Sequence, residues 1–106
     1  MFTQTTYPVI DLAGTGRRIE LRRRQAGLTV REIQAYFGFE YPQAIYKWQH
    51  GECLPTVDNL LALARLLQVS MEDLLVVKDR KVFLLQQFEK NAHFQIPAGK
   101  TKAPPL

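Results

Sequence analysis

The sequence predicts an all-α fold in which five short helices form an orthogonal bundle. Helix-capping residues recur in front of short apolar stripes with helical spacing, and glycines follow several of these stripes. The predicted helices fall within about 60 residues, so the turns between them are tight, which favours an orthogonal bundle over an up-and-down one. With 106 residues, of which 46% are hydrophobic, the chain has material for one core.

The first helix is expected to run from Gly16 to about Gln25. Thr15 is its expected N-cap, because a hydroxyl accepts from the free N–H groups of the first turn. Gly27 is its expected stop, since glycine tolerates the left-handed conformation that follows many helices. Residues 1–14 are then expected to form an N-terminal arm.

The second helix is expected to begin after Thr29, which can form a capping box with Glu32, and to end at Gly38. The third helix is expected over residues 42–50. Pro42 suits its first position, because the N–H that proline lacks would have no hydrogen-bond partner within the helix there. Its apolar stripe consists of Ala44, Ile45 and Trp48.

The fourth helix is expected from Val57, with Thr56 as its cap. Ser70 and Asp73 predict another capping box, for a fifth helix from Met71 to about Val76. The fourth helix has a wide apolar face made of Leu60, Leu61, Leu63, Ala64 and Leu67.

The segment that follows the bundle is compatible with two structures. As a helix it would carry an apolar stripe on Val82, Leu85 and Phe88. As a hairpin it would have strands at Leu74–Val77 and Val82–Leu85, on either side of a polar stretch. Short apolar runs do not decide between helix and strand, so both alternatives stay open.

Three parts are therefore expected: the arm 1–14, the bundle 15–77 and a C-terminal extension 78–106. Residues 78–95 are a candidate dimerisation segment, because an apolar stripe there lies beyond a complete core. Residues 96–106 have a Pro- and Gly-containing composition that predicts a flexible tail.

The formal charge of +4 is unevenly distributed. Residues 15–50 hold seven basic and three acidic side chains, and residues 78–106 hold six and two, a net of +4 in each region. Residues 51–77 hold one basic and four acidic side chains. Basic blocks on either side of an acidic middle favour an acidic partner such as nucleic acid.

Several classes of protein are disfavoured. A single cysteine, Cys53, cannot form an internal disulfide, and two histidines far apart in sequence make a metal site improbable. No stretch approaches the roughly 18 apolar residues of a membrane span, and the first residues lack signal-peptide features. Gly14-Thr15-Gly16 imitates a dinucleotide loop, but Ile19 stands at its third glycine position. We expect a cytoplasmic protein that is neither an enzyme nor a cofactor carrier.

Two short helices joined by a glycine-containing turn form a helix-turn-helix, whose second helix fits a DNA major groove about 12 Å wide. The outer face of the third helix carries the candidate base-reading residues. Gln43 can pair with adenine, and Lys47 with guanine or phosphate. Tyr46 can meet a thymine methyl group, and Pro42 completes this face.

The chain resembles the lambda-repressor-like, Xre-type helix-turn-helix family over about residues 16–77. The matching residues are Leu28-Thr29 to Phe37-Gly38, then Ile45, Lys47, Trp48, Gly51 and Pro55, then Leu60, Leu61, Leu63, Ala64, Leu67, Val69, Ser70, Leu74 and Leu75. Residues 42–51 look like a subgroup of small Firmicutes-type regulators. The resemblance implies a five-helix DNA-binding domain, here with a C-terminal extension, in a sequence-specific regulator that is usually a homodimer.

The resemblance also implies which elements hold phosphates: the start of the second helix and the loop after the third. The candidates there are Thr29, Arg31 and His50. Arg17 and Arg18 are added because a basic run near a DNA-docking helix gains from counterion release.

The sequence departs from the family pattern in the turn of the motif. The spacing from Gly38 to Ile45 is one residue longer than usual, and Gln34 stands where alanine is usual, which indicates a looser turn.

Three further departures affect single contacts. Val30 replaces a phosphate-binding glutamine. Gln49 replaces a glutamate, so we expect at most a hydrogen bond to Arg23. Arg22 occupies a usual leucine site, for which Leu21 is a candidate substitute.

The expected function is that of a transcriptional regulator, more often a repressor, on double-stranded DNA. Two alternatives stay open. One is an antitoxin that also binds a toxin through residues 78–106, and the other is a protein-interaction module that has lost DNA binding.

Overall fold

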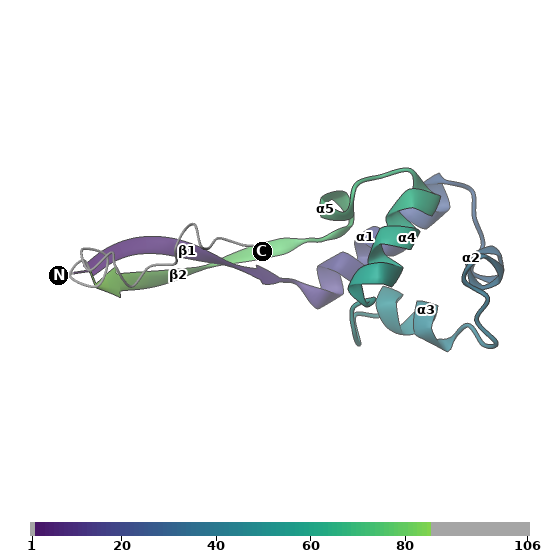
Figure 1. Cartoon of the computed structure of the whole chain (residues 1–106), viewed down its shortest axis with the longest axis horizontal. Coiled ribbons are helices and arrows are strands. Elements are labelled where there is room, and N and C mark those ends of the chain that lie inside the picture. The colour runs from purple at the N-terminus through teal and green to yellow at the C-terminus, as the bar shows by residue number, and fades with distance from the viewer. Residues whose placement is uncertain (1, 86–106) are drawn as a thin grey trace, which may run out of the picture. The chain divides into compact units, whose positions relative to one another are not determined.

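The computed structural model describes residues 2–85. Within them lie five helices and two strands (Figure 1). In chain order they are β1 (Phe2–Ile10), α1 (Leu12–Gln25), α2 (Val30–Phe37), α3 (Gln43–Gln49), α4 (Val57–Leu67), α5 (Met71–Leu74) and β2 (Val77–Leu85). The chain divides into two compact units: a helical body, Val9–Lys78, and a second unit that contains most of both strands.

The five predicted helices are present, but the fold is not strictly all-α, because β1 and β2 pair in a two-stranded sheet whose strands run in opposite directions (Figure 1). The expected arm 1–14 is therefore mostly strand, rich in the Thr, Tyr, Val and Ile residues that suit a pleated backbone. Its partner, β2, follows the five helices in the sequence. A local reading of sequence does not show such a long-range pairing.

The open question about the segment after the bundle is answered in part. Val82–Leu85 is strand, but it pairs with β1, and Leu74–Val77 does not form the other strand of a hairpin. A strand repeats every two residues, so the helical stripe predicted on Val82, Leu85 and Phe88 does not form within β2. Phe88 and the predicted tail 96–106 lie outside the described residues.

Helix α1 begins earlier than predicted, and Thr15 is not its N-cap. Asp11 holds that position, and its carboxylate accepts from the Gly14 amide at 3.1 Å. Thr15 is instead fully buried, and its hydroxyl accepts from the amide of Val76 at 2.9 Å. The Val76 carbonyl in turn accepts from the Asp11 amide at 2.7 Å. These bonds join the start of α1 to the segment after α5.

The other helix ends follow the predicted signals more closely. Thr29 and Glu32 form the predicted capping box, and Gly38 ends α2 in the left-handed region at φ 73°. Ser70 caps α5 by accepting from the Asp73 amide at 3.0 Å. Thr56 holds the N-cap position of α4 as predicted, but its hydroxyl bonds to the Asp58 carboxylate rather than to a backbone amide of the helix.

Helix α5 ends at Leu74, two residues before the predicted end at Val76. Leu75 is extended, and Val76 gives both its backbone groups to α1.

One hydrophobic core holds the helical body together. It contains at least one buried residue from each of the five described helices: Ile19, Ile33, Ile45, Trp48, Leu60, Leu63, Ala64, Leu67 and Leu74. Burying one leucine or isoleucine side chain stabilises a fold by about 1.5–3 kcal/mol. No helix within residues 2–85 combines the length and apolarity needed to cross a bilayer.

Candidate nucleic-acid interface

Helix α3 is held against the body by its buried face. Ile45 is fully buried and Trp48 is 4% exposed. The Trp48 ring packs edge-on against Phe37 and Phe39, with centroid distances of 5.6 and 6.0 Å. Phe37 and Phe39 stack on each other at 5.0 Å. The aromatic cluster thereby joins α3 to α2 and to the turn between them.

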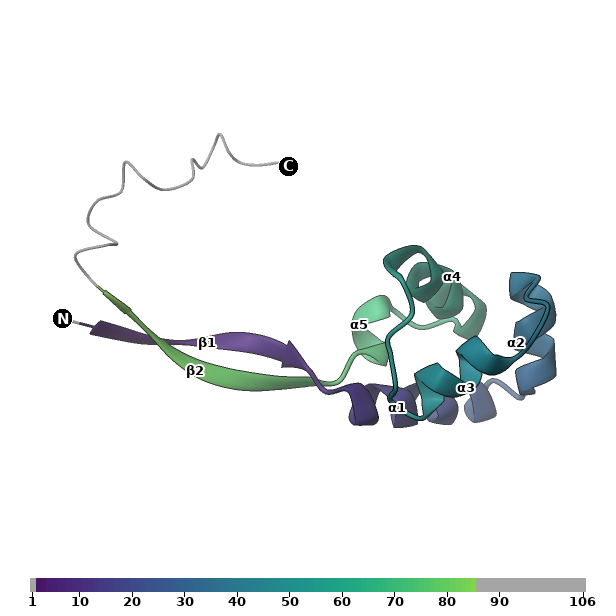
Figure 2. The same ribbon diagram turned by 90° about the horizontal axis from the view of Figure 1, so that it is seen from below.

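Gly16 lets the backbone of α3 approach α1, and the two helices lie alongside each other (Figure 2). A Cβ atom on Gly16 would lie 2.5 Å from the carbonyl oxygen of Trp48 and against that of Gln49. Sequence reasoning missed this role and considered Gly16 only as a helix start and a false dinucleotide loop. The available signal was a glycine inside a helical segment, which often marks close packing.

A side-chain hydrogen bond also links α3 to α1. The Nε of Arg23 donates to the side-chain oxygen of Gln49 at 2.8 Å, which confirms the predicted hydrogen bond. A second nitrogen of Arg23 donates to the carbonyl of Leu28 at 2.9 Å. Arg23, near the end of α1, is therefore bonded both to α3 and to the segment that precedes α2.

The outer face of α3 is open to solvent. Gln43, Tyr46, Lys47 and His50 are exposed, and Tyr46 and His50 stack with their ring centres 6.2 Å apart. Pro42 is half-buried and is the N-cap of α3 rather than its first residue. The candidate base-reading residues thus lie together at α3, opposite the face that Ile45 and Trp48 bury.

The longer turn before α3 is held by Gln34. Its side-chain amide donates to the carbonyls of Phe39 and Glu40, both at 3.2 Å. The residue that indicated a looser turn in the sequence therefore supplies hydrogen bonds that an alanine could not make.

The start of α2 presents one exposed cation, Arg31, which makes no ion pair within residues 2–85. The hydroxyl of Thr29 accepts from the Glu32 amide at 3.1 Å, and the Glu32 carboxylate accepts from the Thr29 amide at 2.8 Å. The Thr29 side chain is therefore used by the helix cap. Val30 packs against the core.

The basic run of α1 is mostly paired within the protein. Arg18 donates to the backbone carbonyl of Asp73 at 2.6 Å, and Arg22 contacts the Asp73 carboxylate at 2.9 Å. Arg24 contacts Glu20 at 2.7 Å, which lowers the pKa of Glu20 below its ordinary value. Arg17 is exposed and has no such partner in the described part of the chain.

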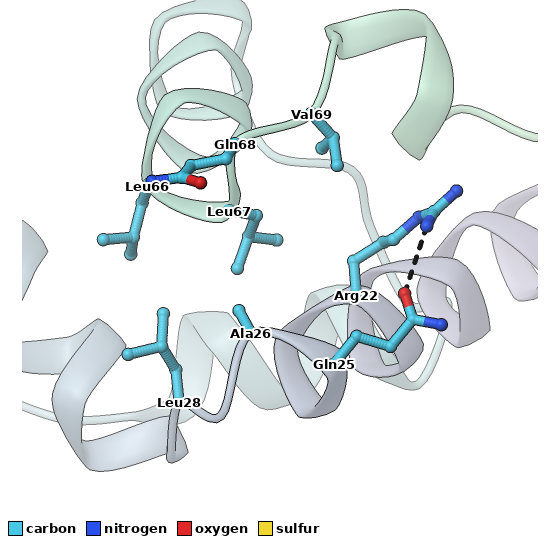
Figure 3. Close-up of a pocket in the computed structure, with 8 residues that line it drawn as sticks. All are labelled: Arg22, Gln25, Ala26, Leu28, Leu66, Leu67, Gln68 and Val69. Carbon is cyan, nitrogen blue, oxygen red and sulfur yellow. Dashed lines mark hydrogen bonds between the residues drawn. The ribbon is translucent and has the colours of Figure 1, made fainter.

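Leu21 does not take the place of the leucine that the family pattern has at position 22, contrary to expectation. Leu21 stays 48% exposed, and Arg22 itself remains at the site and bonds to Asp73 and to Gln25. Beside Arg22 lies a groove of about 450 Å³ between the C-terminal ends of α1 and α4 (Figure 3). Its lining contains none of the predicted site residues: Arg22, Gln25, Ala26, Leu28, Leu66, Leu67, Gln68 and Val69.

The arrangement of α2, the turn and α3 is that of a helix-turn-helix, with α3 as the exposed second helix. The helix-turn-helix family model HTH_3 matches residues 19–74, just over half of the chain. The protein belongs to this family, which is the lambda-repressor-like, Xre-type family that the sequence resembles.

Two solved structures are similar in fold. They are the DNA-binding domain of BldD from S. venezulae and a crystal structure described as the DNA-binding domain of BldD. Each aligns with a TM-score of 0.53 and 21% identity over 61% of this chain, covering 96% and 93% of the respective domains. A search of curated protein sequences gives no significant match.

Proposed function

We propose that this protein is a sequence-specific DNA-binding transcriptional regulator that inserts α3 into the major groove. The observation that carries the proposal is the two-sided nature of α3. Ile45 and Trp48 anchor one face, and Gln43, Tyr46 and Lys47 project from the other. A recognition helix needs both features, since its side chains must reach base edges from a fixed backbone.

The chemistry of the exposed face suits base recognition. The Gln43 amide offers a donor and an acceptor to adenine, and Lys47 donates to guanine or to phosphate. Tyr46 is positioned by its stack with His50, so its ring loses less rotational freedom when it meets a thymine methyl group or a sugar.

The phosphate contacts come from polar and charged side chains around this face. Arg31 at the start of α2 and His50 after α3 are both exposed. On α1, Arg17 is the better candidate for a phosphate contact, because it is exposed, whereas the guanidinium of Arg18 is bonded to Asp73. Thr29 contributes through the helix start that it caps rather than through a free hydroxyl.

The regulatory outcome we propose is repression by occupation of a promoter. As a homodimer, the protein would place two α3 helices on half-sites about one helical turn, 34–36 Å, apart. The BldD domains are described as DNA-binding and share the fold, which supports DNA as the partner.

Selection of bound duplexes from a random pool at controlled salt tests this proposal. We expect enrichment of a near-palindromic sequence with half-sites one turn apart. Recovery of no duplex at low salt would overturn DNA binding. Enrichment without any sequence preference would overturn specific recognition by α3.

A further inference from the structure

The two-stranded ribbon formed by β1 and β2 carries a local excess of positive charge. Within β2, Lys78, Arg80 and Lys81 accompany a single anion, Asp79, and all four are exposed. β1 has no charged residue. The three cations make no ion pair within residues 2–85, so their charge is available to a partner.

The cations are not distributed evenly over the two faces of the ribbon. Arg80 lies over the ring of Tyr7, with its guanidinium carbon 5.1 Å from the ring centre, so these two side chains share a face. Side chains alternate along a strand, so Lys78 belongs to the Arg80 face, whereas Asp79 and Lys81 belong to the other. One face therefore carries two cations and an aromatic ring without an acidic residue of β2.

The contact with Tyr7 also prepares Arg80 for an anionic ligand. A guanidinium that lies over an aromatic ring keeps its N–H groups directed outward in its own plane. That edge matches two oxygens of one phosphate group. Because Tyr7 already restricts the Arg80 side chain, less rotational freedom is lost when a phosphate binds.

The ribbon is poorly suited to pair with a second copy of itself. If the β2 strands of two copies paired, the cations of one copy, Lys78, Arg80 and Lys81, would lie close to the same residues of the other copy. Opposed like charges destabilise a strand pair. On the β1 edge, Pro8 has no N–H to donate. These are the features with which exposed strands avoid self-association.

We propose that the face with Tyr7, Lys78 and Arg80 is a second DNA contact, which binds the phosphate backbone without reading sequence. The inference rests on the proposed function, because the polyanion it requires is the DNA that α3 recognises. A two-stranded ribbon is narrow enough to follow a groove of B-DNA. Its contribution is electrostatic and therefore depends on salt.

The test compares the salt dependence of DNA binding in two full-length variants that lose the same charge. One is the double variant K78Q/R80Q, on the proposed face. The other is R65Q/K81Q, which removes two exposed cations, one on α4 and one on the opposite face of the ribbon. Each protein is titrated with a selected duplex and with a scrambled duplex.

Two phosphate contacts correspond to a slope of about 1.8 in log K against log salt. Between 50 and 200 mM salt, the unmodified protein should therefore lose about 12-fold more affinity than K78Q/R80Q, on both duplexes. R65Q/K81Q should keep the original slope. A charge-preserving variant, K78R/R80K, should also keep it, which separates loss of charge from loss of ribbon structure.

Each other result has a distinct meaning. An unchanged slope in K78Q/R80Q overturns the ribbon contact while leaving recognition by α3 intact. Equal losses in K78Q/R80Q and R65Q/K81Q also overturn it, because the effect then follows total charge. A change in sedimentation of K78Q/R80Q with an unchanged slope indicates a contact between copies instead. Failure of the unmodified protein to bind either duplex contradicts the proposed function itself.

Discussion

The Nε of Arg23 on α1 donates to the side-chain oxygen of Gln49 on α3 at 2.8 Å, in a position where Gln49 is 8% exposed. A neutral amide here holds α3 against the body where the family resemblance implies a carboxylate. The position of α3 therefore depends on a hydrogen bond with a charged donor, together with the packing of Trp48 and Gly16.

Replacing Gln49 with leucine should lower the free energy of unfolding by about 1–3 kcal/mol, since Arg23 then loses a partner in a partly buried site. Replacing Gln49 with glutamate should keep the contact and raise stability, because hydrogen bonds between charged groups are the stronger ones. Urea unfolding at pH 7 measures both variants. A leucine variant as stable as the original protein would show that the bond does not hold α3.

Replacing Gly16 with alanine should destabilise the protein, because the new Cβ would meet backbone carbonyls that cannot rotate away. Overpacking of this kind costs about 1–3 kcal/mol, against about 1 kcal/mol gained in helix propensity. Gly14→Ala is the comparison in the same helix: its Cβ would lie 2.7 Å from the Asp11 carboxylate, so it would disturb the N-cap hydrogen bond but no backbone carbonyl. Thermal unfolding should show the larger loss for Gly16→Ala.

Replacing Lys47 or Gln43 with alanine should cost about 1–3 kcal/mol of binding to the selected duplex, with little change on a scrambled one. Both side chains are exposed, so stability should change little. Fluorescence anisotropy on the two duplexes measures the difference. Unchanged affinity for the selected duplex would show that another face of α3, or another element, reads the bases.

Replacing Arg17 with glutamine should weaken binding equally on all duplexes and lower the salt slope by about 1. Arg18→Gln should instead lower stability, because Arg18 bonds to the Asp73 carbonyl at 2.6 Å. The comparison tests whether Arg17 or Arg18 meets phosphate. The reverse pattern would assign the phosphate contact to Arg18.

Glu20 predicts a small pH effect on stability. The hydrogen bond from Arg24 lowers the pKa of Glu20 in the folded state below its ordinary value of 4.5. The stabilisation is thus present above about pH 4.5 and is lost as the pH falls through the folded pKa. Exposed pairs of this kind contribute about 0.3–0.5 kcal/mol. Urea unfolding of Glu20→Gln should show that difference at pH 7, and the difference should shrink toward pH 3.

The sequence alone determined the features that depend on near neighbours. Thr29 and Glu32 are three residues apart, so their capping box is local, and the spacing of Ile45 and Trp48 identifies the buried face of α3 within two turns. The match of these local patterns to one family was sufficient to predict the helix-turn-helix, and the exposed residues of α3 followed from its buried ones.

Only the tertiary structure decided the features that join distant parts of the chain. β1 pairs with a strand that follows all five helices, and the Thr15 hydroxyl accepts from the amide of Val76 instead of capping a helix. The pairing of Arg18 and Arg22 on α1 likewise depends on Asp73, more than 50 residues away. A hydroxyl, a guanidinium or a strand edge can satisfy its hydrogen bonds in several ways, and the partner it uses is set by which segments the folded chain brings together.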